Sequence, residues 1–229
     1  MKRTLMTVAF AVIAVALGGC QKEHPINLEV DPELESAEGK IAVFPFLSAI
    51  HDSDDPDDIA PITMEKHFIP ALDARNDYTF ISPNTVAYAI DGEEQENRYQ
   101  KFMEEYPRTG EIDPEFLVPL AEALRVDAFM IPVVDVWQKD EVDYQENASP
   151  ATYVGATITI VDRTGQKVLF RATDENYMEG ARSETGDRGI VSSAGRVRSD
   201  SGAKTDRAPP YAEVAIMVIN ALVESLPER

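Results

Sequence analysis

The sequence TYVGATITIVDRTGQKVLFRA, residues 152–172, carries the strongest structural signal in this chain. Residues 152–162 alternate in side-chain character and are rich in β-branched types, and residues 167–172 form a second β-rich run. The turn-forming residues 163–165, Arg-Thr-Gly, lie between the two runs. Two β-rich runs joined by a short loop that contains glycine predict a β-hairpin.

Two other apolar runs predict strands that are buried on both faces of a sheet. They are residues 41–46, IAVFPF, and residues 128–137, AFMIPVVDVW, the second becoming half-exposed at its end. A short strand is also expected at residues 78–81. Apolar spacing, prolines and capping residues predict helices at residues 59–75, 84–106 with a break at Gly92, 113–126 and 212–226. This order predicts a single-domain α/β fold: a mixed β-sheet flanked by helices, with a β-hairpin and a C-terminal helix packed on the sheet.

Two of these helices have side chains whose environment can be predicted. The inward face of residues 59–75 is expected to contain Ile62, Phe68, Ile69 and Leu72. The helix before residue 106 carries a stripe formed by Tyr99, Phe102, Met103 and Tyr106. Such a stripe either packs into the core or forms a groove for a partner, and we expect it to be core.

The N-terminal segment MKRTLMTVAFAVIAVALGGC, residues 1–20, has the features of a secretory signal peptide. A positive start precedes an uncharged apolar run that ends in small residues. As a membrane span the segment is short of the roughly 20 apolar residues that a bilayer requires. The final residues Leu17-Gly18-Gly19-Cys20 resemble the lipobox of bacterial lipoproteins. The resemblance implies cleavage between Gly19 and Cys20 and attachment of acyl chains such as palmitate to Cys20.

The expected domain organisation follows from these features. Residues 1–19 form the lipoprotein signal peptide, residues 20–39 a polar tether, and residues 40–229 a single domain with a flexible loop at residues 180–207. Two or three acyl chains anchor a protein stably to a membrane. By resemblance to enteric lipoproteins, in which an aspartate after the lipidated cysteine retains the protein in the inner membrane, Gln21 favours the outer membrane, facing the periplasm.

Composition restricts the possible functions. The chain has 21 Lys and Arg residues and 41 Asp and Glu residues, a formal net charge of −20, which argues against nucleic acid as a partner. Cys20 is the only cysteine, so after lipidation no disulfide, thiolate metal site or cysteine nucleophile is available. The acidic run HDSDDPDD, residues 51–58, lacks the glycine and closing glutamate of a calcium loop. We therefore expect a solvated loop there, no metal site and no cofactor.

Residues 180–207 differ in composition from the rest of the chain. They contain five glycines, five serines, and six basic against four acidic residues. This composition cannot form an apolar core, so a mobile loop is expected. Its positive balance in an acidic chain suggests contact with an acidic partner, a glycan carboxylate or a phosphate; the alternative is plain disordered surface. The candidate contact residues are Arg182, Arg188, Arg196 and Arg198.

The run at residues 41–46 resembles the (I/V)AVxPF opening of a group of envelope lipoproteins. This group includes the curli-secretion lipoprotein CsgG, the penicillin-binding-protein activator LpoB and the amino-terminal domain of TolB. Residues 120–131, LAEALRVDAFMI, are similar to the group's step from a helix into a strand, with Val126 before Asp127 where the group usually has glycine before an Ala-Asp pair. A closing helix after two prolines is also similar. The resemblance implies an accessory binding module and not a channel.

Signals of catalysis are sparse. The histidines His24, His51 and His67 form no His-x-x-His pair, and the chain has no Gly-x-Ser-x-Gly motif and no phosphate-binding loop. The sequence therefore favours a non-enzymatic, lipid-anchored module that binds a protein partner in an envelope assembly or cell-wall machine. Its contact surface is expected at the sheet edge, at residues 138–150 or at residues 180–207. The alternative is a carboxylate-based hydrolase of cell-wall glycan, which requires two carboxylates in one pocket.

Overall fold

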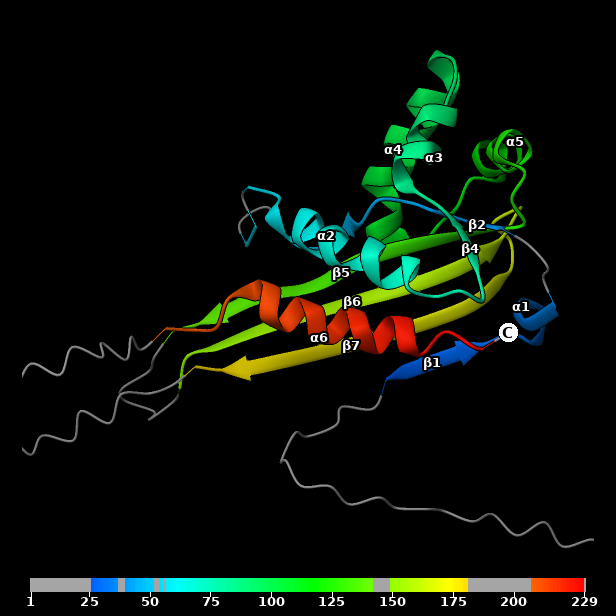
Figure 1. Cartoon of the computed structure of the whole chain (residues 1–229). Helices are drawn as coiled ribbons and strands as arrows, with labels where there is room; N and C mark the ends of the chain where they lie inside the picture. Colours follow the sequence, from blue (N-terminus) through cyan, green and yellow to red (C-terminus); the bar gives the residue numbers. More distant parts are fainter. Residues whose placement is uncertain are drawn as a thin grey trace, which may run out of the picture.

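The computed structural model describes residues 26–36, 40–51, 54–55, 57–141, 149–180 and 207–228. Within these residues, seven strands form one mixed sheet in the order β1-β7-β6-β5-β2-β4, with β3 paired to β5 (Figure 1). The strands are β1 (Asn27–Val30), β2 (Lys40–Val43), β3 (Leu47–Ser48), β4 (Thr79–Ile81), β5 (Ala128–Asp140), β6 (Ala151–Asp162) and β7 (Val168–Glu179). The helices are α1 (Pro32–Ser36), α2 (Ile59–Asp73), α3 (Pro83–Ala89), α4 (Glu93–Thr109), α5 (Pro114–Leu124) and α6 (Tyr211–Glu224). The predicted single α/β domain with a mixed sheet, flanking helices and a C-terminal packing helix is confirmed.

Strand β5 joins the parallel and the antiparallel parts of the sheet. On one side it pairs in parallel first with β2 and then with β3. On the other side it pairs antiparallel with β6, which continues through the predicted hairpin into β7. Strand β7 extends to Glu179, beyond the predicted end at residue 172, and β1 pairs with part of it at the edge of the sheet.

The hairpin turn requires glycine at position 165. Gly165 has a φ of 71°, a left-handed conformation that glycine adopts without steric cost, and a Cβ there would overlap the side chain of Ile112. Asp162 fixes the turn, because its carbonyl accepts a hydrogen bond of 2.9 Å from the Gly165 N–H. Its carboxylate also accepts from the N–H groups of Gln166 and Lys167, at 3.0 and 3.1 Å.

Two hydrophobic cores cover the two faces of the sheet. Helices α2 and α6 pack on one face and enclose the first core, whereas α3, α4 and α5 enclose the second core on the other face (Figure 1). Successive residues of β2 alternate between them: Ile41 and Val43 belong to the first core, and Ala42 to the second. The prediction of a strand buried on both faces is therefore confirmed, and it ends before Pro45.

Capping residues set the starts of two helices as the sequence indicated. The Ser82 hydroxyl accepts a hydrogen bond of 3.4 Å from the Thr85 N–H at the start of α3. The Asp113 carboxylate accepts one of 2.9 Å from the Glu115 N–H at the start of α5. These bonds satisfy donors that have no partner within the helix. The predicted break at Gly92, which has a φ of 86°, separates α3 from α4.

The aromatic stripe on α4 is part of the second core, as expected. Phe102 and Tyr106 are buried, and Tyr99 and Met103 are half-buried against the same core. The ring of Phe102 lies 4.8 Å from that of Phe44, which follows β2. These side chains therefore contribute to the packing of the domain.

The prediction for α2 is correct in part. Phe68 and Leu72 are buried, but Ile62 is 67% exposed. The buried row instead runs through Ala60, Met64, Phe68 and Leu72 at four-residue spacing. Residues at this spacing lie on one side of a helix, and Ile62 lies on the opposite side.

The prediction of a tether over residues 20–39 is wrong for residues 26–36. Strand β1 pairs with β7 along its whole length, and α1 follows it with Leu34 completely buried. The Asp31 carboxylate forms an ion pair of 3.0 Å with Lys167. Every residue of β1 is exposed, so backbone pairing with β7, and not the burial of an apolar face, holds this strand.

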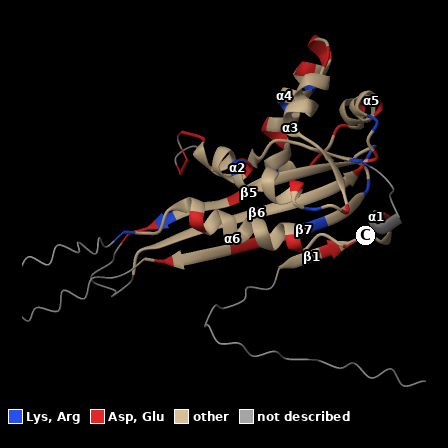
Figure 2. Ribbon diagram, viewed as in Figure 1, with Lys and Arg blue, Asp and Glu red and all other residues tan. Residues whose placement is uncertain are grey.

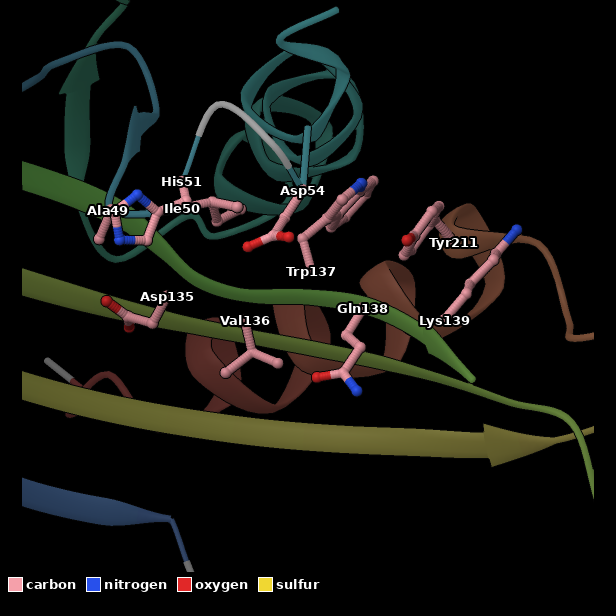
Figure 3. A pocket seen from close by; sticks show the side chains of 10 residues that line it. All are labelled: Ala49, Ile50, His51, Asp54, Asp135, Val136, Trp137, Gln138, Lys139 and Tyr211. Atoms are coloured by element: carbon pink, nitrogen blue, oxygen red, sulfur yellow. The ribbon is translucent and has the colours of Figure 1, made fainter. Parts of the chain in front are cut away.

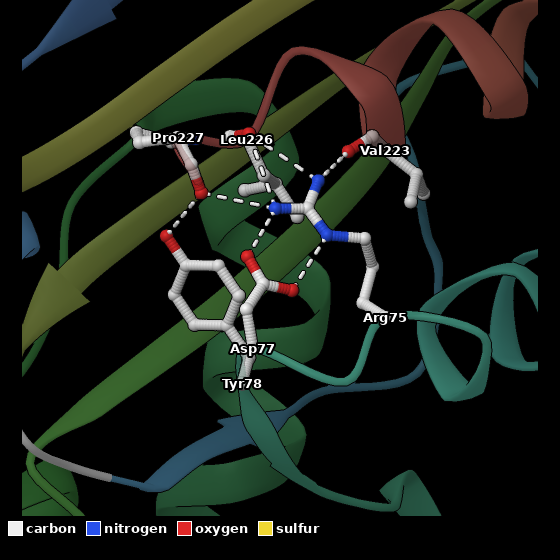
Figure 4. A network of polar contacts seen from close by, with 6 residues as sticks. All are labelled: Arg75, Asp77, Tyr78, Val223, Leu226 and Pro227. Carbon is white, nitrogen blue, oxygen red and sulfur yellow. Dashed lines mark hydrogen bonds and ion pairs between the residues drawn. The ribbon is translucent and has the colours of Figure 1, made fainter. Parts of the chain in front are cut away.

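Arg75, two residues after α2, holds the C-terminal end of the chain (Figure 4). Its guanidinium donates two hydrogen bonds to Asp77, at 2.8 and 2.6 Å. It also donates to the carbonyl groups of Val223, Leu226 and Pro227, at distances from 2.8 to 3.3 Å. The last carbonyls of a helix have no donors within the helix, so Arg75 satisfies groups at the end of α6. Hydrogen bonding to Asp77 raises the pKa of the guanidinium, which stays charged.

Replacing this arginine is expected to destabilise the fold strongly. Arg75→Ala should lower the free energy of unfolding by about 2–4 kcal/mol, because the ion pair with Asp77 and the hydrogen bonds from Arg75 to three carbonyls are lost together. Urea denaturation of the mature chain measures this change.

Arg98→Ala is the matched control. Arg98 contacts Glu94, Asp113 and Glu115, whose side chains are 82%, 44% and 76% exposed, whereas Asp77 is 20% exposed. Water can therefore replace Arg98 more readily, and we expect a smaller loss. Equal losses for the two variants would contradict the role assigned to Arg75.

Candidate functional site

Strands β5, β6 and β7 continue beyond their neighbours as a three-stranded ribbon (Figure 1). The pairing of β3 with β5 ends at Val134, and the pairing of β1 with β7 ends at Thr173. Residues 135–140 of β5 and 174–179 of β7 therefore have no further strand beside them among the described residues. Such edges leave backbone N–H and C=O groups available for pairing. We call residues 135–140, 151–157 and 173–179 the ribbon.

A β-bulge begins the ribbon on β5. The pairing register with β6 shifts between Val134 and Val136, which leaves Asp135 as the extra residue. Gly155 lies opposite the bulge, where a Cβ would approach the Val136 side chain to 3.0 Å. Bulges redirect side chains and are frequent beside functional sites. Here Asp135 forms part of the wall of a pocket, and its carboxylate is turned toward Thr157 of β6.

The pocket has a volume of about 720 Å³ and lies along the free edge of β5 (Figure 3). Its walls are residues 49–51 and Asp54 from the loop before α2, residues 135–139 of β5, and Tyr211 at the start of α6. The wall contains both signs of charge, since Lys139 accompanies the two aspartates. The acidic run of the sequence thus contributes to the pocket through Asp54.

An aromatic stack closes one end of the pocket. The rings of Trp137 and Tyr211 lie 4.1 Å apart and almost parallel, at 9°. The Lys139 ammonium lies 4.4 Å from the Tyr211 ring, a cation–π contact. Trp137 is only 4% exposed, so the stack joins α6 to β5 and offers little aromatic surface to a ligand. The hydroxyl of Thr152 strengthens the junction by donating to the Pro209 carbonyl at 2.6 Å.

A hydrogen bond from Thr157 holds the Asp135 carboxylate, and Thr173 in turn contacts Thr157. Thr157 donates a hydrogen bond of 2.6 Å to that carboxylate, and the Thr157 and Thr173 hydroxyls lie 3.0 Å apart. Burial among its neighbours raises the pKa of Asp135, and the hydrogen bond from Thr157 opposes this shift. The residue as a whole remains exposed, so solvent reaches the pocket side of the carboxylate and keeps the effect small.

The ribbon carries acidic and aromatic side chains on the face away from α6. Tyr153 and Tyr177 lie opposite each other, with their rings 5.6 Å apart and inclined by 21°. Glu175 and Glu179 lie two residues before and two residues after Tyr177 on β7, so all three side chains are on the same face. Figure 2 shows acidic residues at several points of the ribbon. Burial and the nearby Asp140 raise the pKa of the Tyr153 hydroxyl, which stays protonated at neutral pH.

The ends of two segments outside the described residues meet at the tip of the ribbon. The Gly180 N–H donates a hydrogen bond of 2.7 Å to the Pro150 carbonyl, and Gly180 also lies against the carbonyl of Arg207. The described residues Pro150, Gly180 and Arg207, close to the ends of 142–148 and 181–206, therefore lie together at this tip. Of the expected contact segment at residues 138–150, residues 138–140 belong to β5.

Most of the predicted site residues lie outside the described residues. These are Leu17, Gly19 and Cys20 of the lipobox and Arg182, Arg188, Arg196 and Arg198 of the proposed contact loop. Within the described part of the chain, no group of three or more His, Cys, Asp or Glu side chains is placed to hold a metal ion. No helix in that same part is long and apolar enough to cross a membrane.

The pocket itself was not predicted from the sequence. Its signal was present in the run 128–137, where Asp135 interrupts an apolar strand. Val134 and Trp137 both pack into the first core although they are three residues apart, an odd spacing that a regular strand cannot place on one face. Such a break in alternation is the sequence sign of a bulge.

No protein-family model matches the chain, and no curated protein matches it in sequence. Solved structures with a similar fold include a PelC dodecamer from Paraburkholderia phytofirmans, at 13% identity and a TM-score of 0.47, covering 90% of this chain and 98% of that one. They include the lipoprotein GNA1162 from Neisseria meningitidis, at 19% identity and a TM-score of 0.38, covering 64% and 88%. The LpoB C-terminal domain from Salmonella enterica matches at 7% identity and a TM-score of 0.31, covering 62% and 84%. These low values confine the likeness to general architecture, and they identify no site, reaction or partner.

Asp135→Asn is expected to raise the free energy of unfolding near neutral pH, by less than about 1 kcal/mol because the residue is exposed. A raised pKa means that the folded chain binds the proton more tightly than the unfolded chain. Ionised Asp135 therefore costs stability above the unfolded pKa of about 3.9, and the cost disappears below it. The gain of the variant should shrink on acidification.

Urea denaturation of both chains at about pH 7 and about pH 4 tests this expectation. Asparagine keeps an oxygen that can accept the Thr157 hydroxyl, so the hydrogen bond is preserved. Asp127→Asn, at an exposed position before β5, controls for the loss of one negative charge. A gain for Asp135→Asn that grows on acidification would contradict the assignment.

Proposed function

We propose that this chain is a lipid-anchored protein of the bacterial envelope that acts as a non-catalytic accessory module and requires no cofactor. It binds a protein partner that belongs to an envelope assembly or cell-wall machine. Acyl chains on Cys20, exposed by cleavage after Gly19, hold it to the membrane. Gln21 supports the outer membrane, facing the periplasm.

The ribbon is the observation that carries this proposal. Residues 135–140 of β5 present a free backbone edge, and a strand from another protein can pair with such an edge. The pocket beside this edge can receive side chains of that strand. Asp135 and Lys139 provide opposite charges there, which gives the contact a defined orientation.

The two segments that emerge at the tip of the ribbon support the same location. Residues 181–206 are flanked by Gly180 and Arg207, which lie in contact, and Pro150, two residues after 148, contacts Gly180. Their sequences differ from each other, the first being acidic and the second rich in arginine and glycine. We retain Arg182, Arg188, Arg196 and Arg198 as proposed contact residues, because the segment that carries them is flanked by residues at the tip of the ribbon.

A second candidate function rests on one feature of the pocket. Asp54 and Asp135 lie in the same pocket, and burial raises the pKa of Asp135, the direction that a general acid requires (Figure 3). A glycan hydrolase uses two carboxylates on either side of the glycosidic bond. The non-catalytic proposal predicts that the purified chain releases no sugar from cell-wall glycan. Sugar release that disappears in Asp135→Asn would favour the hydrolase instead.

Cross-linking in living cells tests the adaptor function. A photoreactive amino acid in place of Gln138, an exposed residue on the free edge of β5, should capture one dominant envelope protein that mass spectrometry identifies. The same amino acid in place of Tyr88, which is 89% exposed on α3, should not capture it. Equal capture from both positions, or no specific partner at Gln138, would contradict the proposal.

Two further variants test the partner contact and the membrane anchor separately. Deletion of residues 182–206 should reduce capture from Gln138 if the arginine-rich segment contributes to the contact. Cys20→Ala should move the chain from the membrane fraction to the soluble fraction, because the only acylation site is lost. Capture that survives the deletion would place the contact on the folded part alone.

A further inference from the structure

Strand β1 fixes the point at which the chain leaves the folded domain toward Cys20. Ile26 is half-buried and packs against the first core, and β1 pairs with β7 directly after it. Six residue steps separate Cys20 from Ile26, and an extended chain covers at most about 3.6 Å per step. The lipidated cysteine is therefore no more than about 22 Å from Ile26 in any conformation.

This reach is shorter than the width of the sheet. Strands β1 and β4 form its two edges, and five strand spacings of about 4.8 Å place them roughly 24 Å apart. Helices α3, α4 and α5 lie on the side away from β1 (Figure 1). Acyl chains on Cys20 can therefore enter a bilayer that lies beside β1 but cannot reach one that lies beyond β4, at the opposite edge of the sheet.

The exposed side chains of β1 suit a lipid surface. Leu28 is 48% exposed and Val30 is 37% exposed. Glu29 lies between them in the sequence, so Leu28 and Val30 share one face of the strand and Glu29 is on the other. Glu29, together with the strongly acidic chain, disfavours anionic headgroups. Two apolar side chains beside an acidic one therefore fit a zwitterionic phospholipid surface.

The geometry points to a fixed orientation of this domain on its membrane. Strand β1 and the adjoining edge of β7 face the bilayer, Leu28 and Val30 contact zwitterionic phospholipid, and α3, α4 and α5 project away from it. The inference rests on the lipid anchor of the proposed function. In this orientation the ribbon runs along the membrane, and the pocket on β5, two strands away from β7, stays open to a partner.

Energy transfer to a labelled membrane tests the orientation. The full lipidated chain is placed in vesicles of zwitterionic phosphatidylcholine and phosphatidylethanolamine that contain a headgroup-labelled acceptor lipid. A donor dye is attached to Glu29→Cys or to Tyr88→Cys, and lipidated Cys20 offers no competing thiol. Transfer should be several-fold stronger from position 29 than from position 88. Insertion of about 20 Gly and Ser residues after Pro25 should reduce this difference, because it lengthens the connection.

The apolar contact has its own test. In chains that carry the donor at position 29, Leu28→Ser with Val30→Ser should reduce transfer, whereas Ile62→Ser, at a 67% exposed position on α2, should not. Unchanged transfer in the double variant would overturn the contact of these two side chains with lipid.

Vesicle flotation distinguishes failure of the orientation from failure of the proposed function. A chain that floats with the vesicles but shows equal transfer from positions 29 and 88 overturns the orientation and leaves the anchor intact. A chain that does not float overturns the lipid-anchored function, and the orientation with it.

Discussion

Burial of β5 on both faces is the constraint on which the rest of the structure depends. Ala128 and Met130 pack into the first core and Phe129 and Ile131 into the second, and none of the four is more than 1% exposed. Burying one large apolar side chain contributes about 1.5–3 kcal/mol, so this strand supports both helical layers at once. It also pairs with β2 in parallel and with β6 antiparallel, so it joins the two kinds of sheet. From Asp135 onward, residues of the same strand line the pocket.

The parts of the fold that the sequence predicts well are those with a local physical cause. The hairpin at Gly165 needs a positive φ, and α5 begins at Asp113 because its carboxylate caps the helix. The parts that it does not predict depend on distant partners. Strand β1 buries none of its side chains, and it exists because β7 offers it backbone groups more than 130 residues away. The polar second half of β7 is held in the same way by β6.

In the functional site too, the features with a local cause were predicted and those that depend on distant residues were not. The sequence indicated the sheet edge and the segments around 138–150 and 180–207 as places of contact, and the structure brings the ends of these segments together. It did not indicate that Tyr211, residues 49–51 and Asp54 would complete a pocket with β5, since these residues are far apart along the chain. The lipobox residues are predicted by a motif that needs no folded structure, and their role stays a prediction.

The contact of Gly180 with Arg207 makes the connection between β7 and α6 a natural position for insertion. When the two ends of a segment are adjacent, a doubling of its length costs only about 0.6 kcal/mol in loop closure, and neither flanking element has to move. Residues 181–206 can therefore be lengthened, shortened or exchanged during evolution while both cores keep their packing. The sequence of this segment and the sequence of the scaffold can then diverge at different rates, because a change in one requires no change in the other.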